Sequence, residues 1–216
     1  MKTHALILLL HLTLCCFAIT GTVSADLIVN GGFESPAVPG FISVTAPSSF
    51  SGWTVLSGGV DIVSSDFYNA SSGIQSLDLN TIVSGSISQD LATTPGQEYF
   101  LSFAFAANPL PDDPSWPAPA IKVMEAHWNT SLLGTFSQDS TGHTATVVGW
   151  IVHIYTVIGT GTDRLSFASL TDGSAGPALD DVRLEPVPEP STFVLAALGL
   201  IGLAALVWRR RRWPLN

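Results

Sequence analysis

Apolar and polar residues alternate along most of the chain, in short segments separated by Gly, Ser, Pro, Asn and Asp. The clearest segment, residues 99–106, places four large apolar side chains on one face of an extended strand: Tyr99, Leu101, Phe103 and Phe105. Between residues 26 and 186 no useful run has the 3.6-residue period of an amphipathic helix. Short strands with regular turn signals are typical of an all-β sandwich or jelly roll. The other strands are predicted at 27–30, 53–56, 60–63, 74–79, 86–91, 121–128, 132–136, 147–158, 164–170 and 177–184.

Three segments stand out within this pattern. Residues 36–52 are rich in Pro, Ser, Phe and Gly, and residues 108–119 have too many prolines to form a strand ladder, so both are predicted to be loops. Residues 147–158 are apolar on both faces, which predicts a central strand or a strand at a dimer contact. Gln89 falls on the apolar face of its strand, where we expect a buried, hydrogen-bonded amide.

The chain begins with a secretory signal, residues 1–25. Lys2 gives a basic start, residues 5–19 are mostly apolar, and small residues precede a predicted cleavage between Ala25 and Asp26. A lipoprotein signal at Cys15 is the alternative, but a large leucine occupies the position before it, where a small residue is needed.

Residues 187–216 form a second predicted targeting segment. Residues 192–208 are uncharged and mostly apolar, near the shortest length that spans a bilayer, which predicts a transmembrane helix. The four arginines at 209–212 would stay in the cytoplasm, which places the domain at 26–186 outside. Directly before the helix stands a short motif: Val187, Pro188, Glu189, Pro190 and Ser191.

This combination of motif, apolar helix and basic end resembles the PEP-CTERM sorting signal. The resemblance implies export through the Sec machinery, recognition by an exosortase, and transfer to the cell surface or beyond after a transient stay in the membrane. A permanent single-span anchor with a proline-rich stalk is the alternative. In either case Glu189 belongs to a recognition motif and is not catalytic.

The charge distribution excludes one class of partner. The whole chain carries a net charge of −9, but residues 26–187 hold sixteen acidic residues against Lys122, Arg164 and Arg183. Such a surface repels phosphate backbones, so nucleic-acid binding is not expected. Both cysteines, Cys15 and Cys16, lie in the signal, so the mature domain would have no disulfide.

Several motifs in the domain, taken in order, resemble those of the choice-of-anchor C family, which is akin to plant cell-wall proteins of unknown function. The resemblance implies a galactose-binding-like jelly roll and leaves the activity open. The motifs that carry it are Leu-Ile-Val-Asn-Gly-Gly-Phe-Glu at 27–34, Trp53, Val-Asp-Ile at 60–62, Ser-Leu-Asp-Leu at 76–79, Pro-Gly-Gln-Glu-Tyr at 95–99 and Gly-Pro-Ala-Leu-Asp-Asp-Val at 176–182.

The same resemblance indicates a possible metal site. Glu34 near the first predicted strand and Asp180 and Asp181 in the last could join backbone carbonyls at 30–32 in a structural Ca²⁺ site made of oxygen ligands. The alternative is a turn at 30–32, with the carboxylates solvated or bonded to backbone amides.

Three residues are candidates for ligand contact. Trp116 lies in the proline-rich loop, where its ring could stack on a sugar. Asp61 and Asp78 alternate with core residues and could share a binding face, although most such aspartates face solvent. Trp53 and Trp150 follow strand patterns and are expected in the core.

These observations predict an exported, non-catalytic surface or matrix protein that binds carbohydrate, such as the producer's exopolysaccharide. The alternative is a structural or adhesive protein that contacts other proteins through strand edges. A third reading, a glycan-active enzyme using Asp61 or Asp78, has no recognisable catalytic motif to support it.

Overall fold

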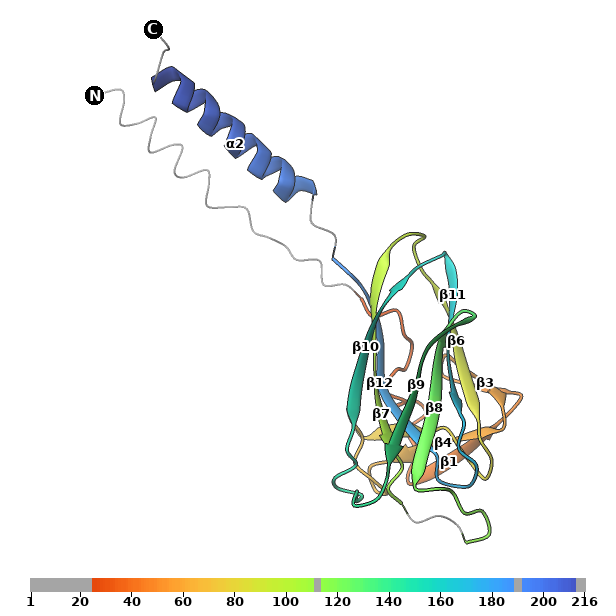
Figure 1. Cartoon of the computed structure of the whole chain (residues 1–216). Helices are drawn as coiled ribbons and strands as arrows, with labels where there is room; N and C mark the ends of the chain where they lie inside the picture. Colours follow the sequence, from red (N-terminus) through yellow and green to blue (C-terminus); the bar gives the residue numbers. More distant parts are fainter. Residues whose placement is uncertain (1–24, 111–113, 189–191, 213–216) are drawn as a thin grey trace.

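The chain forms two six-stranded antiparallel sheets that pack face to face (Figure 1). The structure, a computed structural model, describes residues 25–110, 114–188 and 192–212. Consecutive strands repeatedly change sheet, as in a jelly roll, and this confirms the predicted all-β fold.

Sheet A contains the strands that carry the candidate site. In spatial order they are β1 (Phe41–Thr45), β4 (Gly59–Ser64), β5 (Gln75–Asp78), β12 (Pro177–Pro186), β7 (Glu98–Ala107) and β10 (Ile151–Ile158). Sheet B faces it and consists of β2 (Ser48–Phe50), β3 (Trp53–Ser57), β6 (Ser86–Ala92), β11 (Thr162–Ser169), β8 (Ile121–Trp128) and β9 (Ser131–Asp139).

The main core lies between the sheets. Because side chains alternate across a strand, most of the strands direct every second side chain, usually an apolar one, into this layer. The predicted inward face of residues 99–105 is buried throughout. Phe103 of β7 meets Phe167 of β11 edge to face, with ring centroids 5.0 Å apart, and Trp53 is fully buried as predicted.

A second, smaller apolar cluster covers the outer face of sheet A. Val63 follows the core residue Ile62 in β4 and therefore points away from the main core. Tyr68 and Val148, from loops beside the sheet, pack against it there. Only part of this outer face is covered, and the exposed remainder is where a site can form.

The opening segment is not the strand that its sequence predicts. The carboxylate of Asp26 accepts the backbone N–H groups of Ile28 and Leu184, at 2.9 Å each. The side-chain amide of Gln89 binds both the N–H and the carbonyl of Val29. Side chains therefore satisfy the backbone groups that a neighbouring strand would otherwise pair, and the buried, bonded amide of Gln89 is confirmed.

Two further predictions were wrong. Residues 36–52 are not only a loop, because they contain the edge strands β1 and β2. Residues 147–158 do not form a central strand: β10 begins at Ile151 and lies at the edge of sheet A, where Val152 and Ile154 are exposed. A sequence that is apolar on both faces of a strand does not indicate whether the strand lies at the edge or in the centre of its sheet.

The C-terminal helix is α2 (Thr192–Arg212). In the described part of the chain, no helix is both long and apolar enough to cross a membrane, so the transmembrane segment predicted at 192–208 is not confirmed. The signal at residues 1–24 and Glu189, Pro190 and Ser191 of the sorting motif lie outside the described residues.

Candidate functional site

A pocket with a volume of about 380 Å³ opens on the outer face of sheet A. Its floor is made by β1, β4 and β5, and its walls come from residues 67–68, 81–82, 108–110 and 174–175. The volume lies within the range of about 300–1,000 Å³ that is usual for small-molecule sites. Six side chains carry the chemistry of this pocket: Phe41, Ser43, Asp61, Phe67, Tyr68 and Asp78.

Asp61 and Asp78 lie directly opposite each other on β4 and β5. Their chain neighbours Ile62 and Leu77 point into the main core, so alternation turns both aspartates to the outer face. The structure thus brings together two residues that the sequence placed 17 positions apart, in one pocket.

Asp78 is a buried, fully bonded carboxylate. It accepts the side-chain amide of Asn108 at 2.5 Å and the backbone N–H groups of Asn80, at 2.8 Å, and Gly176, at 3.1 Å. Burial raises its pKa to about 7 despite these bonds, because no cation compensates the lost hydration. Asp78 therefore ties the loops after β7 and before β12 to the pocket floor.

Asp61 is the carboxylate that a ligand can reach. It is half-buried and accepts one hydrogen bond, from the Ser43 hydroxyl at 2.6 Å. Burial raises its pKa to about 6, so it is ionised at neutral pH. None of the described side chains that line the pocket is a Lys, Arg or His.

Three aromatic rings border the carboxylates. Phe41, which is 52% exposed, meets Phe67 edge to face with ring centroids 5.5 Å apart. Tyr68 is buried, and its hydroxyl lies beside Ser76, closed off from solvent. Burial, and then the nearby Asp78 carboxylate, raises the pKa of Tyr68 well above its ordinary value, so the phenol is neutral.

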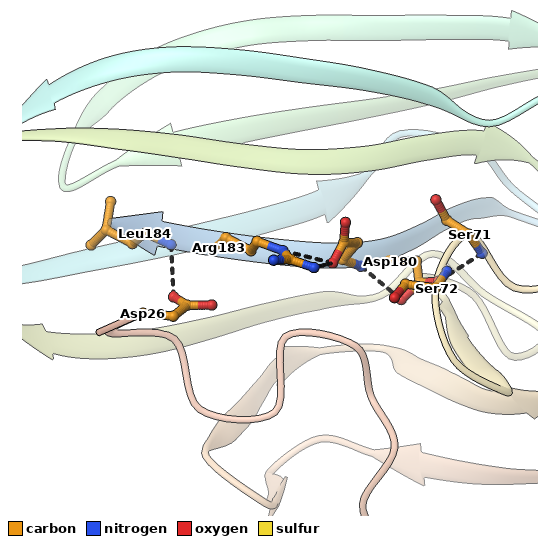
Figure 2. A network of polar contacts seen from close by, with 7 residues as sticks. Asp26, Ser71, Ser72, Asp180, Arg183 and Leu184 are labelled. Carbon is orange, nitrogen blue, oxygen red and sulfur yellow. Dashed lines mark hydrogen bonds and ion pairs between the residues drawn. The ribbon is translucent and has the colours of Figure 1, made fainter. Parts of the chain in front are cut away.

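The wall that carries Phe67 and Tyr68 is held by two of the carboxylates considered for calcium. Asp180 accepts the backbone N–H groups of Ser71 and Ser72, at 2.8 and 2.9 Å (Figure 2). Glu34 accepts the backbone N–H groups at 74 and 75, at 2.7 and 3.0 Å. These two carboxylates therefore fix the C-terminal half of the segment that links β4 to β5.

Asp181, the third candidate, points elsewhere. It forms an ion pair with Arg183 at 2.7 Å. It has a positive φ of 48° and lies in a bulge of β12. Asp180 and Glu34, by contrast, both lie close to Gly32.

The backbone carbonyls proposed as further calcium ligands are largely engaged. The carbonyl of Asn30 accepts hydrogen bonds from Phe33 and from the Trp53 indole, and that of Gly31 accepts one from Val182. Across the described residues, no group of three or more His, Cys, Asp or Glu is placed to hold a metal. The contacts observed match the alternative of carboxylates bonded to backbone amides, and the calcium site stays a prediction.

Trp116 is 45% exposed, as a stacking residue would have to be. Its carbonyl accepts the backbone N–H of Ser174, a residue that lines the pocket, at 2.9 Å. The indole itself is not among the described lining residues, so Trp116 lies on the segment next to the pocket. Trp150 is half-buried against the smaller cluster and donates to the carbonyl of Asn69 at 2.9 Å.

Sequence reasoning missed the aromatic part of the site. Phe41 and Ser43 belong to a segment predicted to be a loop, although they alternate there with Ile42 and Val44, as strand residues do. Phe67 and Tyr68 lie in a turn, and nothing in their local sequence indicates that they reach the same pocket as residues of β1.

Fold and site together define an all-β sandwich domain with a pocket on the outer face of one sheet. The chain belongs to the family described as "Protein of unknown function (DUF642)", which matches residues 26–185. Residues 186–212 match the PEP-CTERM protein-sorting motif. Both resemblances inferred from the sequence are thereby confirmed, and the chain carries a signal for sorting an exported protein.

Solved structures with a related fold are carbohydrate-binding modules of low sequence identity. A family 35 module from Clostridium thermocellum is 14% identical, covering 68% of this chain and 98% of its own, with a TM-score of 0.43. TmCBM61, solved with beta-1,4-galactotriose, is 17% identical, covering 76% and 100%, with a TM-score of 0.44. A CBM35 from Paenibacillus barcinonensis is 14% identical, covering 68% and 99%, with a TM-score of 0.40. No curated protein matches the chain.

Proposed function

We propose that this protein is an exported, non-catalytic carbohydrate-binding protein of the cell surface, and that the pocket over β1, β4 and β5 binds the sugar. The observation that carries the proposal is the pair of exposed phenyl rings, Phe41 and Phe67, beside the reachable carboxylate of Asp61 in one pocket.

Sugar recognition needs both kinds of group. The apolar C–H face of a sugar ring packs against aromatic rings, and its hydroxyls bond to fixed polar side chains. Phe41 and Phe67 supply the first surface, while Asp61 supplies an acceptor. The volume of about 380 Å³ is suited to a short part of a glycan and not to a whole folded partner.

The bonding of Asp78 supports a binding role over hydrolysis. A glycosidase needs two carboxyl groups that both reach the scissile bond. Both oxygens of Asp78 are taken by donors from three other residues, and its side chain is almost completely buried. Asp61 is left without a second reachable carboxyl group among the described lining residues.

The sorting motif supports a place outside the cell. A protein sorted for export meets the polysaccharide that its own cell secretes before any other glycan, so exopolysaccharide is the ligand that we propose. Processing by an exosortase would release the domain at 26–186 into that matrix.

A binding assay on residues 26–187 tests this function. This fragment contains all twelve strands and both apolar clusters, so it holds the complete core. We expect retention on at least one polysaccharide in a glycan array, and a loss of about 5- to 150-fold in affinity for Phe41→Ala, because one stacking ring is worth about 1–3 kcal/mol with its buried area.

Phe100→Ala is the matched control. Phe100 is 46% exposed, on the same sheet, but outside the pocket. Its loss should leave affinity unchanged. If no polysaccharide is retained, with or without Ca²⁺, the proposed function is wrong.

One feature supports the alternative of an adhesive protein. Strand β10 is a free edge of sheet A, it has no charged residue or proline, and Val152, Ile154 and Ile158 are exposed on it. Such an edge can pair with another strand. Sedimentation of residues 26–187 that shows a dimer, abolished by Ile154→Lys and unaffected by sugar, would favour this second function.

A further inference from the structure

Among the described residues that line it, the pocket is acidic and has no compensating cation. Lys122 is buried and is not among those lining residues. Arg164 is paired with Asp90 at 2.6 Å and Arg183 with Asp181, both outside the pocket. Among the described residues, Asp61 accepts one hydrogen bond, from the Ser43 hydroxyl. A carboxylate in this state attracts a cation more strongly than any neutral group.

The pocket also offers acceptors and few donors. The Ser43 hydroxyl already donates to Asp61, and the amide of Asn108 already donates to Asp78. The hydroxyls of a neutral or an acidic sugar both donate and accept, and a uronate adds further acceptors, whereas an ammonium group is a charged donor in all three directions.

The aromatic rings point to the same ligand. A cation within about 6 Å of a ring centroid is attracted to the ring face, and phenyl and phenol rings both serve. Phe41, Phe67 and Tyr68 border the same pocket as Asp61. Rings and a carboxylate together are the combination that retains an organic ammonium.

We infer that this pocket, if it binds sugar as proposed above, selects a sugar residue with a free amino group over neutral, N-acetylated or acidic sugars. The ammonium of a 2-amino-2-deoxyhexose would bond to Asp61 while its ring lies against Phe41 and Phe67. Acetylation removes the charge and adds an acceptor, and a uronic acid brings a second negative charge to Asp61. The burial-raised pKa of about 6 leaves Asp61 charged at neutral pH, which is what this pairing needs.

Isothermal titration of residues 26–187 at pH 7 tests the inference. The probes are the disaccharide of glucosamine, the disaccharide of N-acetylglucosamine, lactose and the disaccharide of galacturonic acid. We expect the amino disaccharide to bind at least about tenfold more tightly than the other three. Asp61→Asn keeps the shape and the acceptor for Ser43, so it should abolish this preference while retaining any affinity for lactose.

Glu98→Gln controls for the general attraction of an acidic domain for cations. It removes the same charge from the start of β7, whereas Asn108 of the pocket follows the end of that ten-residue strand, about 30 Å away. The control variant should keep the full preference. Ethanolamine, an ammonium without a sugar ring, should bind far more weakly than the amino disaccharide.

The outcomes separate the inference from the proposed function. Equal or tighter binding of lactose or the N-acetylated disaccharide overturns the amino-sugar inference and leaves sugar binding intact. An equal loss in Glu98→Gln and Asp61→Asn, or equally tight binding of ethanolamine, also overturns the inference. If none of the four disaccharides binds and the glycan array is blank, both fail.

Discussion

Two buried carboxyl groups of the domain predict that its stability falls as pH rises. Asp78 and Asp180 are 2% and 0% exposed, and burial raises the pKa of each from 3.8 to about 7. Between the unfolded-state pKa of 3.8 and the folded-state pKa of about 7, the unfolded chain has released both protons and the folded chain still holds them. The folded state therefore loses stability as pH rises from about 4 to about 7.

The magnitude follows from the proton count. Each group contributes about 1.4 kcal/mol per pH unit in this window, so the two together contribute at most about 8 kcal/mol across it. This is comparable to the total stability of a typical domain, about 5–15 kcal/mol. Asp61, with a pKa raised by burial to about 6, acts in the same direction but is partly screened by solvent.

Other groups interfere little between pH 6.5 and 8. Burial lowers the pKa of His153, which removes stability only when pH falls below its ordinary value of 6.5. Burial opposes ionisation of Asp163 too, but hydrogen bonds from Asn129, Thr93 and Thr160 outweigh it and lower its pKa to about 2, outside this range.

Urea denaturation of residues 26–187, with EDTA present, measures the effect. We expect the midpoint to fall as pH rises from 5.5 to about 7 and to level off by pH 8, with a constant m-value. Asp180→Asn lowers stability at every pH but should halve the slope, because one of the two titrating groups is removed. A midpoint that is level or rises over this range refutes the reasoning.

Three further predictions concern the contacts around the site. A Cβ at Gly31 would lie 1.9 Å from the carbonyl oxygen of Val182, so Gly31→Ala should lower the free energy of unfolding, measured by urea denaturation, by about 3 kcal/mol. A Cβ at Gly96 meets nothing within 4 Å, so Gly96→Ala should cost about 1 kcal/mol, for its positive φ alone. Equal losses in the two variants would contradict the packing argument. Asp163→Ala leaves several donors without an acceptor and should cost about 3 kcal/mol, and a loss below 1 kcal/mol would show that water replaces the carboxylate. If Glu34 and Asp180 hold calcium, Ca²⁺ at a hundredfold excess over its Kd should stabilise the domain by about 2.7 kcal/mol at pH 8. A thermal melt measures this stabilisation, and EDTA should reverse it. An unchanged melting temperature would contradict the calcium prediction.

The strands that the sequence predicted well are those with one apolar face. Residues 99–106 read as a strand because their period of two is unbroken, and β7 has its large side chains in the core as that period requires. The strand predicted at residues 27–30 was wrong, because the side chains of Asp26 and Gln89 bind the backbone groups of this segment. Local sequence carries no sign of a hydrogen bond to a residue 60 positions away.

The sequence predicted only part of the site, because the rest of it depends on contacts between residues that are distant in the chain. Asp61 and Asp78 were found because each alternates with core residues in a strand pattern, and their pairing follows once β4 and β5 are neighbours. The rings of Phe41 and Phe67 are brought beside them by an edge strand and a turn, and both depend on long-range contacts.

The sequence by itself determined the class of this protein: a sorting motif at one end, an acidic domain without cysteine, and strands whose period of two demands a two-layer sandwich. Those properties are local, because they depend on composition and on neighbours two residues apart. Only the tertiary structure decided that Asp180 and Glu34 fasten the wall of a pocket, and that Asp61 remains free to meet a ligand there. Burial and hydrogen-bond partners belong to the packed arrangement, and residues distant in the chain acquire them only when the two sheets form.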